Sequence, residues 1–194
     1  MAGGYSRLRD FGIGILAEPG DHIRMTENDI LVALDAAVAE PALARHLAAV
    51  IPTLELRLRV DPDASMAWEP IPLSTYRELP PDIKSSWVFI LRAGVTTGAE
   101  RHPNSHQRMV SYRGSGDFPT QRDGQWESHR LTSDRARGIA DRWVSIPPYT
   151  WHQGIVDPDQ NWVVVSFHTV EAEALIEERP GGGEDAVQRR HYLE

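Results

Sequence analysis

Residues 94–116 of the chain read GVTTGAERHPNSHQRMVSYRGSG. Within this stretch Glu100 and His102 are two residues apart, and side chains at that spacing in a strand point to the same face. The Pro-Asn-Ser run at 103–105 predicts a turn, after which the chain returns as an antiparallel neighbour. Gln107 on the returning strand would then face the same side. The stretch therefore predicts two paired strands whose polar side chains converge on one cavity.

A second stretch, residues 141–154, reads DRWVSIPPYTWHQG. Its Pro-Pro-Tyr run predicts a turn, and His152 follows at the start of a strand. In a barrel, this histidine would come from the opposite sheet toward Glu100 and His102. A few polar groups that converge in an otherwise apolar barrel mouth are typical of a ligand site.

The residues around these stretches indicate a β domain. The segment LELRLRV at 54–60 alternates apolar and charged residues, which predicts a half-buried strand. Further short apolar runs separated by turn residues lie at 87–91, 108–112, 126–131, 143–146 and 162–167. Short strands with regular turn signals favour a sandwich or barrel, and the chain shows no internal repeat. We therefore expect one barrel, over residues 54–178.

The chain before the barrel is predicted to form a helical hairpin. Thr26 and Asp29 form a capping-box pattern, and apolar residues then recur at helical spacing. Pro41 separates this helix from a second one, which we expect to end at Pro52. The predicted helical segment, residues 1–53, would bury its apolar stripe against the barrel or a second copy, and a homodimer is expected.

The end of the chain shows two further features. Residues 171–178, EAEALIEE, predict a short helix. The Pro-Gly-Gly-Gly run that begins at residue 180 favours loss of order, so residues 179–194 are expected to form a mobile tail.

The two quoted stretches resemble the cupin superfamily, whose motifs are G-x5-H-x-H-x4-E-x6-G and G-x5-P-x-G-x2-H-x3-N. Aligned without gaps, Glu100 and His102 occupy the two histidine positions of the first motif, and Gln107 occupies the glutamate position. Pro147 and His152 match the second motif. The resemblance covers about the central third of the chain. It implies a mainly β, single jelly-roll barrel with one divalent metal ion.

This chain departs from the cupin pattern at several positions. Asp141 and Tyr149 stand where glycines are usual, and Val156 replaces the asparagine. At the metal, the resemblance implies the ligands Glu100, His102, Gln107 and His152, so two of the four usual ligand residues are replaced.

The strings ERHPNSHQR and PPYTWHQ are also similar to the metal segments of gentisate-type ring-cleaving dioxygenases. That likeness puts Glu100, His102 and His152 on the three metal positions, although that family uses three histidines. It also puts Arg108 where the family has an arginine. Two imidazoles and one carboxylate are common in non-haem Fe(II) oxygenases, so iron is expected, while Mn, Ni, Co and Zn accept similar ligands.

The resemblance leads to a functional hypothesis. We expect a metal-dependent enzyme, an oxygenase that acts on a small organic acid. Arg108 or Arg113 would pair with the carboxylate of the substrate, and Tyr149 would line the pocket. Isomerase or lyase chemistry needs the same ligands, and a non-catalytic binding or sensor protein is the rival interpretation.

Several alternatives remain at the site. His106 and Gln107 are adjacent, so only one of them faces the metal, and a slip of one residue would give a site of three histidines. Gln107 is a poor ligand that would otherwise hold a histidine tautomer by hydrogen bonding. Glu100 would otherwise be a surface carboxylate. His129 and His168 are interpreted as wall residues of the barrel.

Composition excludes other classes of protein. The net charge of −8 argues against a nucleic-acid surface, and the absence of cysteine excludes disulfides and thiolate ligands. No stretch approaches the roughly 20 apolar residues of a membrane helix, and the first residues lack a signal-peptide core. A cytoplasmic protein with a small-molecule partner is expected.

Overall fold

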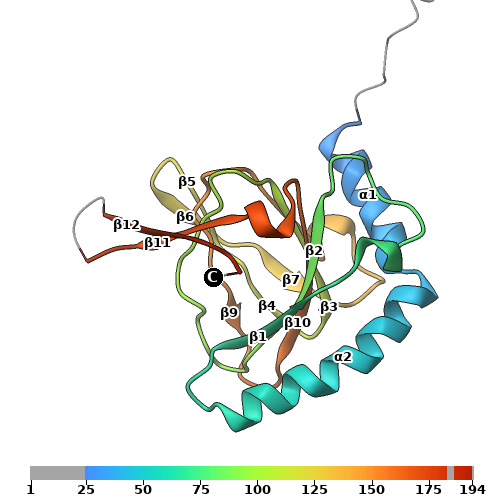
Figure 1. The fold of residues 1–194 in the computed structure, drawn as a ribbon, viewed down its shortest axis with the longest axis horizontal. Helices are drawn as coiled ribbons and strands as arrows, with labels where there is room; N and C mark the ends of the chain where they lie inside the picture. The colour runs from blue at the N-terminus through green and yellow to red at the C-terminus, as the bar shows by residue number, and fades with distance from the viewer. Residues whose placement is uncertain (1–24, 183–185, 194) are drawn as a thin grey trace, which may run out of the picture.

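A computed structural model describes residues 25–182 and 186–193 of the chain. In this part, two helices lead into a mainly antiparallel β domain (Figure 1). The helices are α1 (Glu27–Val38) and α2 (Pro41–Val60). The strands are β1 (Met66–Pro70), β2 (Ser85–Leu91), β3 (Gln107–Arg113), β4 (Ser115–Asp117), β5 (Thr120–Arg122), β6 (Gln125–Glu127), β7 (Arg130–Thr132), β8 (Trp143–Ile146), β9 (Ile155–Val156), β10 (Trp162–His168), β11 (Ile176–Pro180) and β12 (Val187–His191).

The strands form a double-sheet barrel. The larger sheet has the order β1-β2-β10-β3-β8, and the smaller one has the order β7-β4-β9. Leu91, Met109 and Val164 of the larger sheet pack with Leu131 and Val156 of the smaller one to form the interior core. The structure confirms the predicted fold class, a mainly β jelly-roll with N-terminal helices, although α1 and α2 follow one another at an angle and do not pack together as a hairpin (Figure 1).

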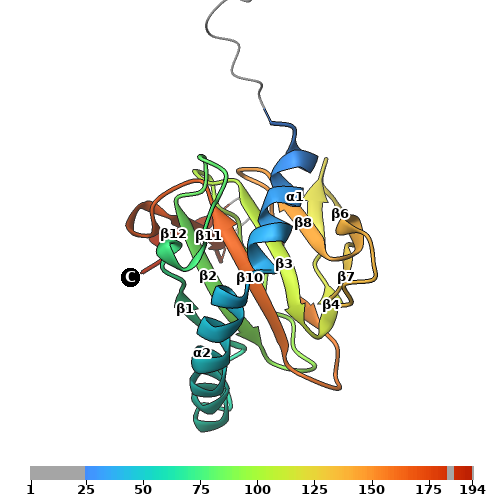
Figure 2. The ribbon, with the colours of Figure 1, turned by 90° about the vertical axis from the view of Figure 1, so that its right-hand side faces the viewer.

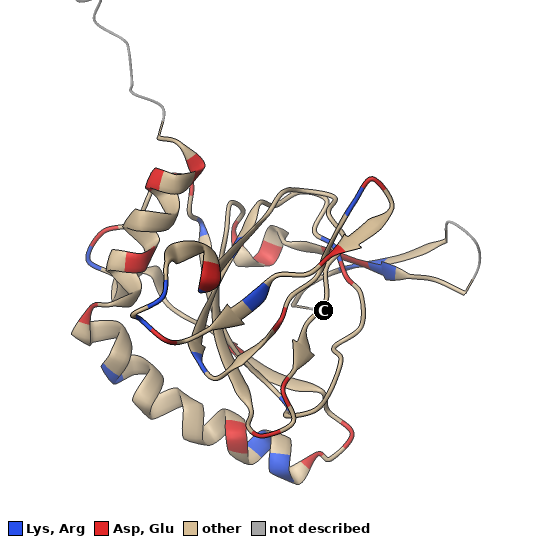
Figure 3. Cartoon of the chain, turned by 180° about the vertical axis from the view of Figure 1, so that it is seen from behind, with Lys and Arg blue, Asp and Glu red and all other residues tan. Residues whose placement is uncertain are grey.

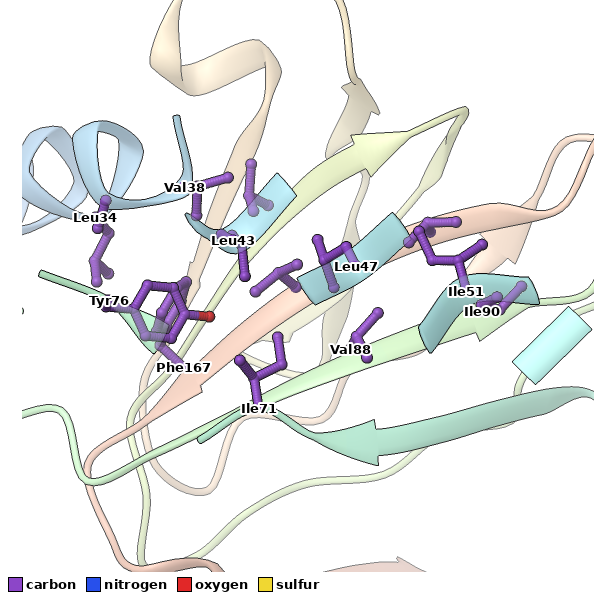
Figure 4. Packing of buried hydrophobic residues seen from close by; sticks show 14 of the residues in the cluster. Leu34, Val38, Leu43, Leu47, Ile51, Ile71, Tyr76, Val88, Ile90 and Phe167 are labelled. Carbon is purple, nitrogen blue, oxygen red and sulfur yellow. The ribbon is translucent and has the colours of Figure 1, made fainter. Parts of the chain in front are cut away.

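The two N-terminal helices lie one after the other across the outer face of the larger sheet (Figure 2). Leu34 of α1 and Leu43 and Leu47 of α2 are buried in one cluster with Val88 of β2 and Phe167 of β10 (Figure 4). Side chains of β10 therefore pack alternately into two cores, one under the helices and one inside the barrel. The apolar stripe predicted from the sequence is covered by the chain's own barrel, so it gives no argument for a second copy.

The strand predicted over residues 54–60 is wrong, because α2 continues through Pro52 to Val60. Leu54 and Leu58 are buried at helical spacing, whereas Leu56 and Val60 are exposed. A proline in a helix interior removes a backbone hydrogen bond and costs about 3 kcal/mol of stability. The free energy gained by burial of the continuous apolar stripe of α2 offsets this cost. Among the described residues, no helix is both long and apolar enough to span a membrane.

The C-terminal part is more ordered than the sequence predicts. In place of a helix over residues 171–178, the structure has a 3-10 turn at Ala172–Ala174 and then strand β11. In place of a mobile tail over 179–194, β11 and β12 pair as an antiparallel hairpin. Strand β1 (Met66–Pro70), which pairs with β2, had no predicted counterpart. The first 24 residues of the predicted helical segment 1–53 lie outside the described residues.

Helix α1 is attached to the barrel by charge as well as by apolar contact. Its only charged side chains are acidic, as the red positions on this helix show in Figure 3. Asp35 accepts hydrogen bonds from Nη1 and Nη2 of Arg142, at 2.6 and 2.7 Å, and from Nε1 of Trp143 at 2.9 Å. Burial raises the pKa of the Asp35 carboxyl, but these hydrogen bonds outweigh it, so the pKa lies below the ordinary value.

Replacement of Leu34 by Ala should destabilise the protein by about 2–5 kcal/mol, because it leaves a cavity between α1 and the sheet. Leu34 is 0% exposed, whereas Val32 on the same helix is 49% exposed. Val32→Ala is therefore the matched control and should change the free energy of unfolding by less than about 1 kcal/mol. Urea denaturation measures both, and equal effects of the two variants would contradict this packing.

Replacement of Asp35 by Asn should cost about 1.5–3 kcal/mol at neutral pH, because it removes charged hydrogen bonds to the buried Arg142. A carboxyl whose folded-state pKa is lowered stabilises the fold above its unfolded pKa, near 4, and this contribution is lost as the pH falls. The wild type should therefore lose more stability than Asp35→Asn between about pH 5 and about pH 3. Parallel denaturation curves for the two proteins across that range would show that the pair does not titrate as described.

Candidate metal site

The two predicted segments meet directly, through the backbones of Glu100 and His152. The amide of Glu100 donates to the carbonyl of His152 at 2.9 Å, and the amide of His152 donates back at 2.9 Å. A third bond joins the segments where the amide of Tyr149 donates to the carbonyl of His102 at 3.1 Å. Residues that are distant in sequence are thus held opposite each other by an antiparallel bridge.

Three side chains converge at this bridge. Glu100, His102 and His152 each offer one ligand atom, and these atoms all lie within 4.8 Å of one another. Both histidines are buried, and the Glu100 side chain is only 14% exposed. A carboxylate and two imidazoles at this spacing are suitable ligands for a divalent transition metal, so the predicted residues fit the metal that the sequence implied.

Backbone carbonyls fix the tautomers of the two histidines. Nδ1 of His102 lies 2.9 Å from the carbonyl oxygen of Ile176, and Nδ1 of His152 lies 3.0 Å from that of Thr150. Since a carbonyl only accepts, each Nδ1 is the donor, and each Nε2 carries the lone pair in the neutral ring. Nε2 of His152 is buried and has no hydrogen-bond partner among the described residues. Orientation of a ligating imidazole through its other nitrogen is typical of metal sites.

The local charges favour the ligand forms of these groups. Burial raises the pKa of Glu100, but interactions with His152, His102 and Arg179 outweigh it and lower the pKa to about 2. Burial, and after it the electrostatic interaction with the neighbouring His152, lower the pKa of His102 below its ordinary value. The carboxylate is therefore ionised and His102 neutral at neutral pH, which is what metal binding requires.

The structure places Gln107, and not His106, on the same side as Glu100. Gln107 is buried and lines the interior cavity together with Glu100, and its Oε1 has no hydrogen-bond partner in the described part of the chain. His106 lies on the opposite face, where its Nε2 is 2.8 Å from Oγ of Ser145 and 3.7 Å from Oε1 of Glu27. The register has not slipped, so His106 does not join His102 and His152 at the site.

The residues expected to contact a substrate lie elsewhere. Arg108 follows Gln107 in the strand and therefore points away from the cavity, where it binds Glu27 at 2.8 Å and Asp82 at 3.0 Å. Arg113 is paired with Glu55. These arginines are thus already neutralised outside the barrel, in contrast to the role expected for them.

Tyr149 also lies outside the cavity. Its side chain is 61% exposed and lies 5.9 Å from the guanidinium of Arg101. Its backbone has φ +64°, in the left-handed region that glycine adopts most easily, which explains why the cupin motif has a glycine at this position.

Sequence reasoning missed the contribution of the C-terminal hairpin. Nη2 of Arg179 donates to Oε2 of Glu100 at 2.7 Å, and Ile176 of the same strand accepts from His102. Opposite charges two residues apart, as at Glu177 and Arg179, lie on the same face of a strand and could have indicated β11. The glycine run that follows favoured a mobile tail in its place. His168, interpreted as a wall residue, is buried with its ring centroid 5.1 Å from that of His102.

The interior cavity that Glu100 and Gln107 line is small. It measures about 30 Å³ and is lined mainly by apolar side chains. The lining residues are Met66, Phe89, Leu91, Thr97, Glu100, Gln107, Met109, Phe118 and Val164. This volume accommodates a water molecule or a ligand of similar size.

Comparison with known proteins gives partial matches to solved structures alone. No family model matches the chain, and no curated protein matches it. Solved structures that match in part include the capsular polysaccharide assembling protein CapF from Staphylococcus aureus, with 16% identity and a TM-score of 0.44 over 55% of this chain and 29% of that one. Pumpkin pro-11S globulin matches with 14% identity and a TM-score of 0.47 over 60% of this chain and 28% of that one.

Oxalate oxidase in complex with the substrate analogue glycolate matches with 15% identity and a TM-score of 0.41 over 54% of this chain and 51% of that one. The matched region thus spans less than a third of the length of the first two proteins and about half of the third. The sheet order of this chain, and the two histidine segments that meet inside its barrel, give the jelly-roll architecture that the cupin resemblance implied.

Proposed function

We propose that this chain is a metal-dependent cupin enzyme, a non-haem oxygenase that acts on a small organic acid. The observation that supports it best is the cluster of one carboxylate oxygen and two imidazole nitrogens within 4.8 Å inside the barrel. Two histidines and one carboxylate leave coordination positions open, as an oxygenase requires. Iron is the metal we expect, and Mn, Ni, Co and Zn accept the same ligands.

The residues of the chain have distinct roles in this proposal. Glu100 supplies the negative charge, while His102 and His152 present Nε2 because carbonyl groups hold Nδ1. Gln107 offers an uncommitted carbonyl oxygen that serves as a fourth ligand or accepts a hydrogen bond from the substrate. When bound, the metal ion supplies Lewis-acid chemistry and a binding position for the substrate.

The small cavity favours a second candidate, a non-catalytic metal-binding or sensor cupin. A volume of about 30 Å³ is far below that of ordinary ligand pockets, which are roughly 300–1,000 Å³. In addition, no arginine of β3 faces the cavity to pair with an acid. An organic acid would have to bind through the metal and displace apolar side chains such as Phe118. Isomerase and lyase chemistry would meet the same restriction.

The metal site is tested by the metal content of purified protein without a histidine tag. Wild type should bind about one divalent ion per chain, and His102→Ala and His152→Ala should lose most of it. His106→Ala is the matched control, because this histidine lies in the same segment but on the outer face, and it should retain the metal. Retention of metal by His102→Ala and His152→Ala, measured by mass spectrometry, would remove the basis of the proposal.

The choice between enzyme and sensor is tested with Fe(II)-loaded protein and a panel of aliphatic and aromatic carboxylic acids. An oxygenase should consume dioxygen with at least one acid, as measured with an oxygen electrode, and His152→Ala should abolish the consumption. An acid that raises the melting temperature of the loaded protein without consumption of dioxygen would favour the sensor. Metal binding with neither response to any acid would leave a metal-binding protein and contradict the oxygenase.

A further inference from the structure

The C-terminal hairpin contains a network of buried charges. Glu177 and Glu178 on β11 are each only 1% exposed. Glu177 accepts from Nε of Arg179 at 2.7 Å and from Nε of Arg190 at 2.9 Å. Glu178 binds Arg101 at 2.7 Å and also Arg189. Buried carboxylates without such partners would be strongly destabilising, so the network fixes the positions of these arginines.

Arg179 connects this network to the candidate metal site. Its Nε donates to Oε1 of Glu177 at 2.7 Å, while its Nη2 donates to Oε2 of Glu100, also at 2.7 Å. The other oxygen of Glu100, Oε1, remains on the side of His152, 3.7 Å from its Nε2. The Arg179 guanidinium thus binds one oxygen of the Glu100 carboxylate, while the other oxygen lies on the side of His152.

We propose that Arg179 is a positioning residue of the metal site, which fixes Glu100 so that Oε1 is presented to the metal ion. This inference rests on the proposed metal site. A planar guanidinium suits the role, because its several donors bind two carboxylates at once in a fixed geometry, which a lysine does not do. Ile176 of the same strand orients His102, so β11 supports two of the three ligands.

Two effects of Arg179 on metal affinity oppose each other. Its positive charge repels a cation, whereas its hydrogen bond orients the ligand. The charge is compensated by Glu177, which is 2.7 Å away, so we expect the repulsion to be small. Loss of groups that orient metal ligands typically lowers metal affinity by about 10–100-fold. The orientation effect should therefore dominate, and removal of Arg179 should weaken metal binding.

The experiment compares wild type with Arg179→Met and Arg179→Lys by titration with Co(II), with visible absorption and calorimetry as readouts. Arg179→Met should weaken Co(II) binding by about 10–100-fold and change the d–d absorption bands, because Glu100 is no longer held. Arg179→Lys should give an intermediate loss, since one ammonium binds Glu100 or Glu177 less well than the guanidinium binds both. If Arg179→Met does not fold, the Arg179→Lys comparison decides alone.

Arg189→Met is the matched control, because it removes an arginine of the same hairpin that binds Glu178 and does not contact Glu100. It should destabilise the hairpin but leave the Co(II) affinity and spectrum of the folded protein unchanged. Unchanged or tighter Co(II) binding by the Arg179 variants would overturn the inference, as would an equal loss in Arg189→Met. Failure of wild type to bind Co(II) or any other divalent metal would instead refute the proposed function.

Discussion

The pair of backbone hydrogen bonds between Glu100 and His152 is the constraint on which the candidate site depends. It joins two segments that arrive from different parts of the barrel, and it sets the carboxylate and the imidazole side by side. His102 follows by the two-residue repeat of an extended chain. Backbone bonds from Tyr149 to His102 and from Thr97 to Gly154 continue the same alignment on either side of this bridge.

The sequence predicted the parts of the site that follow from local geometry. The spacing of Glu100 and His102 and the turn before His152 were enough to bring these side chains together. The pairing expected between the Glu100 segment and the Gln107 strand is wrong, because β3 pairs with β10 and β8 while Glu100 pairs with His152. The alternation within β3 is as predicted, with Gln107 facing inward and Arg108 outward. The substrate-binding role expected for Arg108 came from the family resemblance and not from the two-residue repeat of the strand. In the structure Arg108 points away from the cavity and binds Glu27 and Asp82.

The remaining differences come from interactions between distant residues, which local patterns do not show. Leu54 and Leu58 satisfy both the two-residue and the four-residue repeat, so only packing against the sheet decides for a helix. Strands β11 and β12 lack the apolar character of core strands. They are held in a hairpin by Glu177 and Glu178, whose arginine partners lie partly in other segments. The sequence shows that these residues are charged, but it does not show that the charges are buried against one another.

The position of β10 in the larger sheet has a consequence for how the protein is made. This strand lies between β2 and β3, and both pair with it and not with each other. A ribosome releases the chain from its N-terminus, so β1, β2, β3 and β8 all emerge before the strand that unites them. Until then the nascent sheet consists of two separate strand pairs with open edges, β1 with β2 and β3 with β8. Such edges invite association with other chains, so in the cell this stage is where chaperones would be needed most.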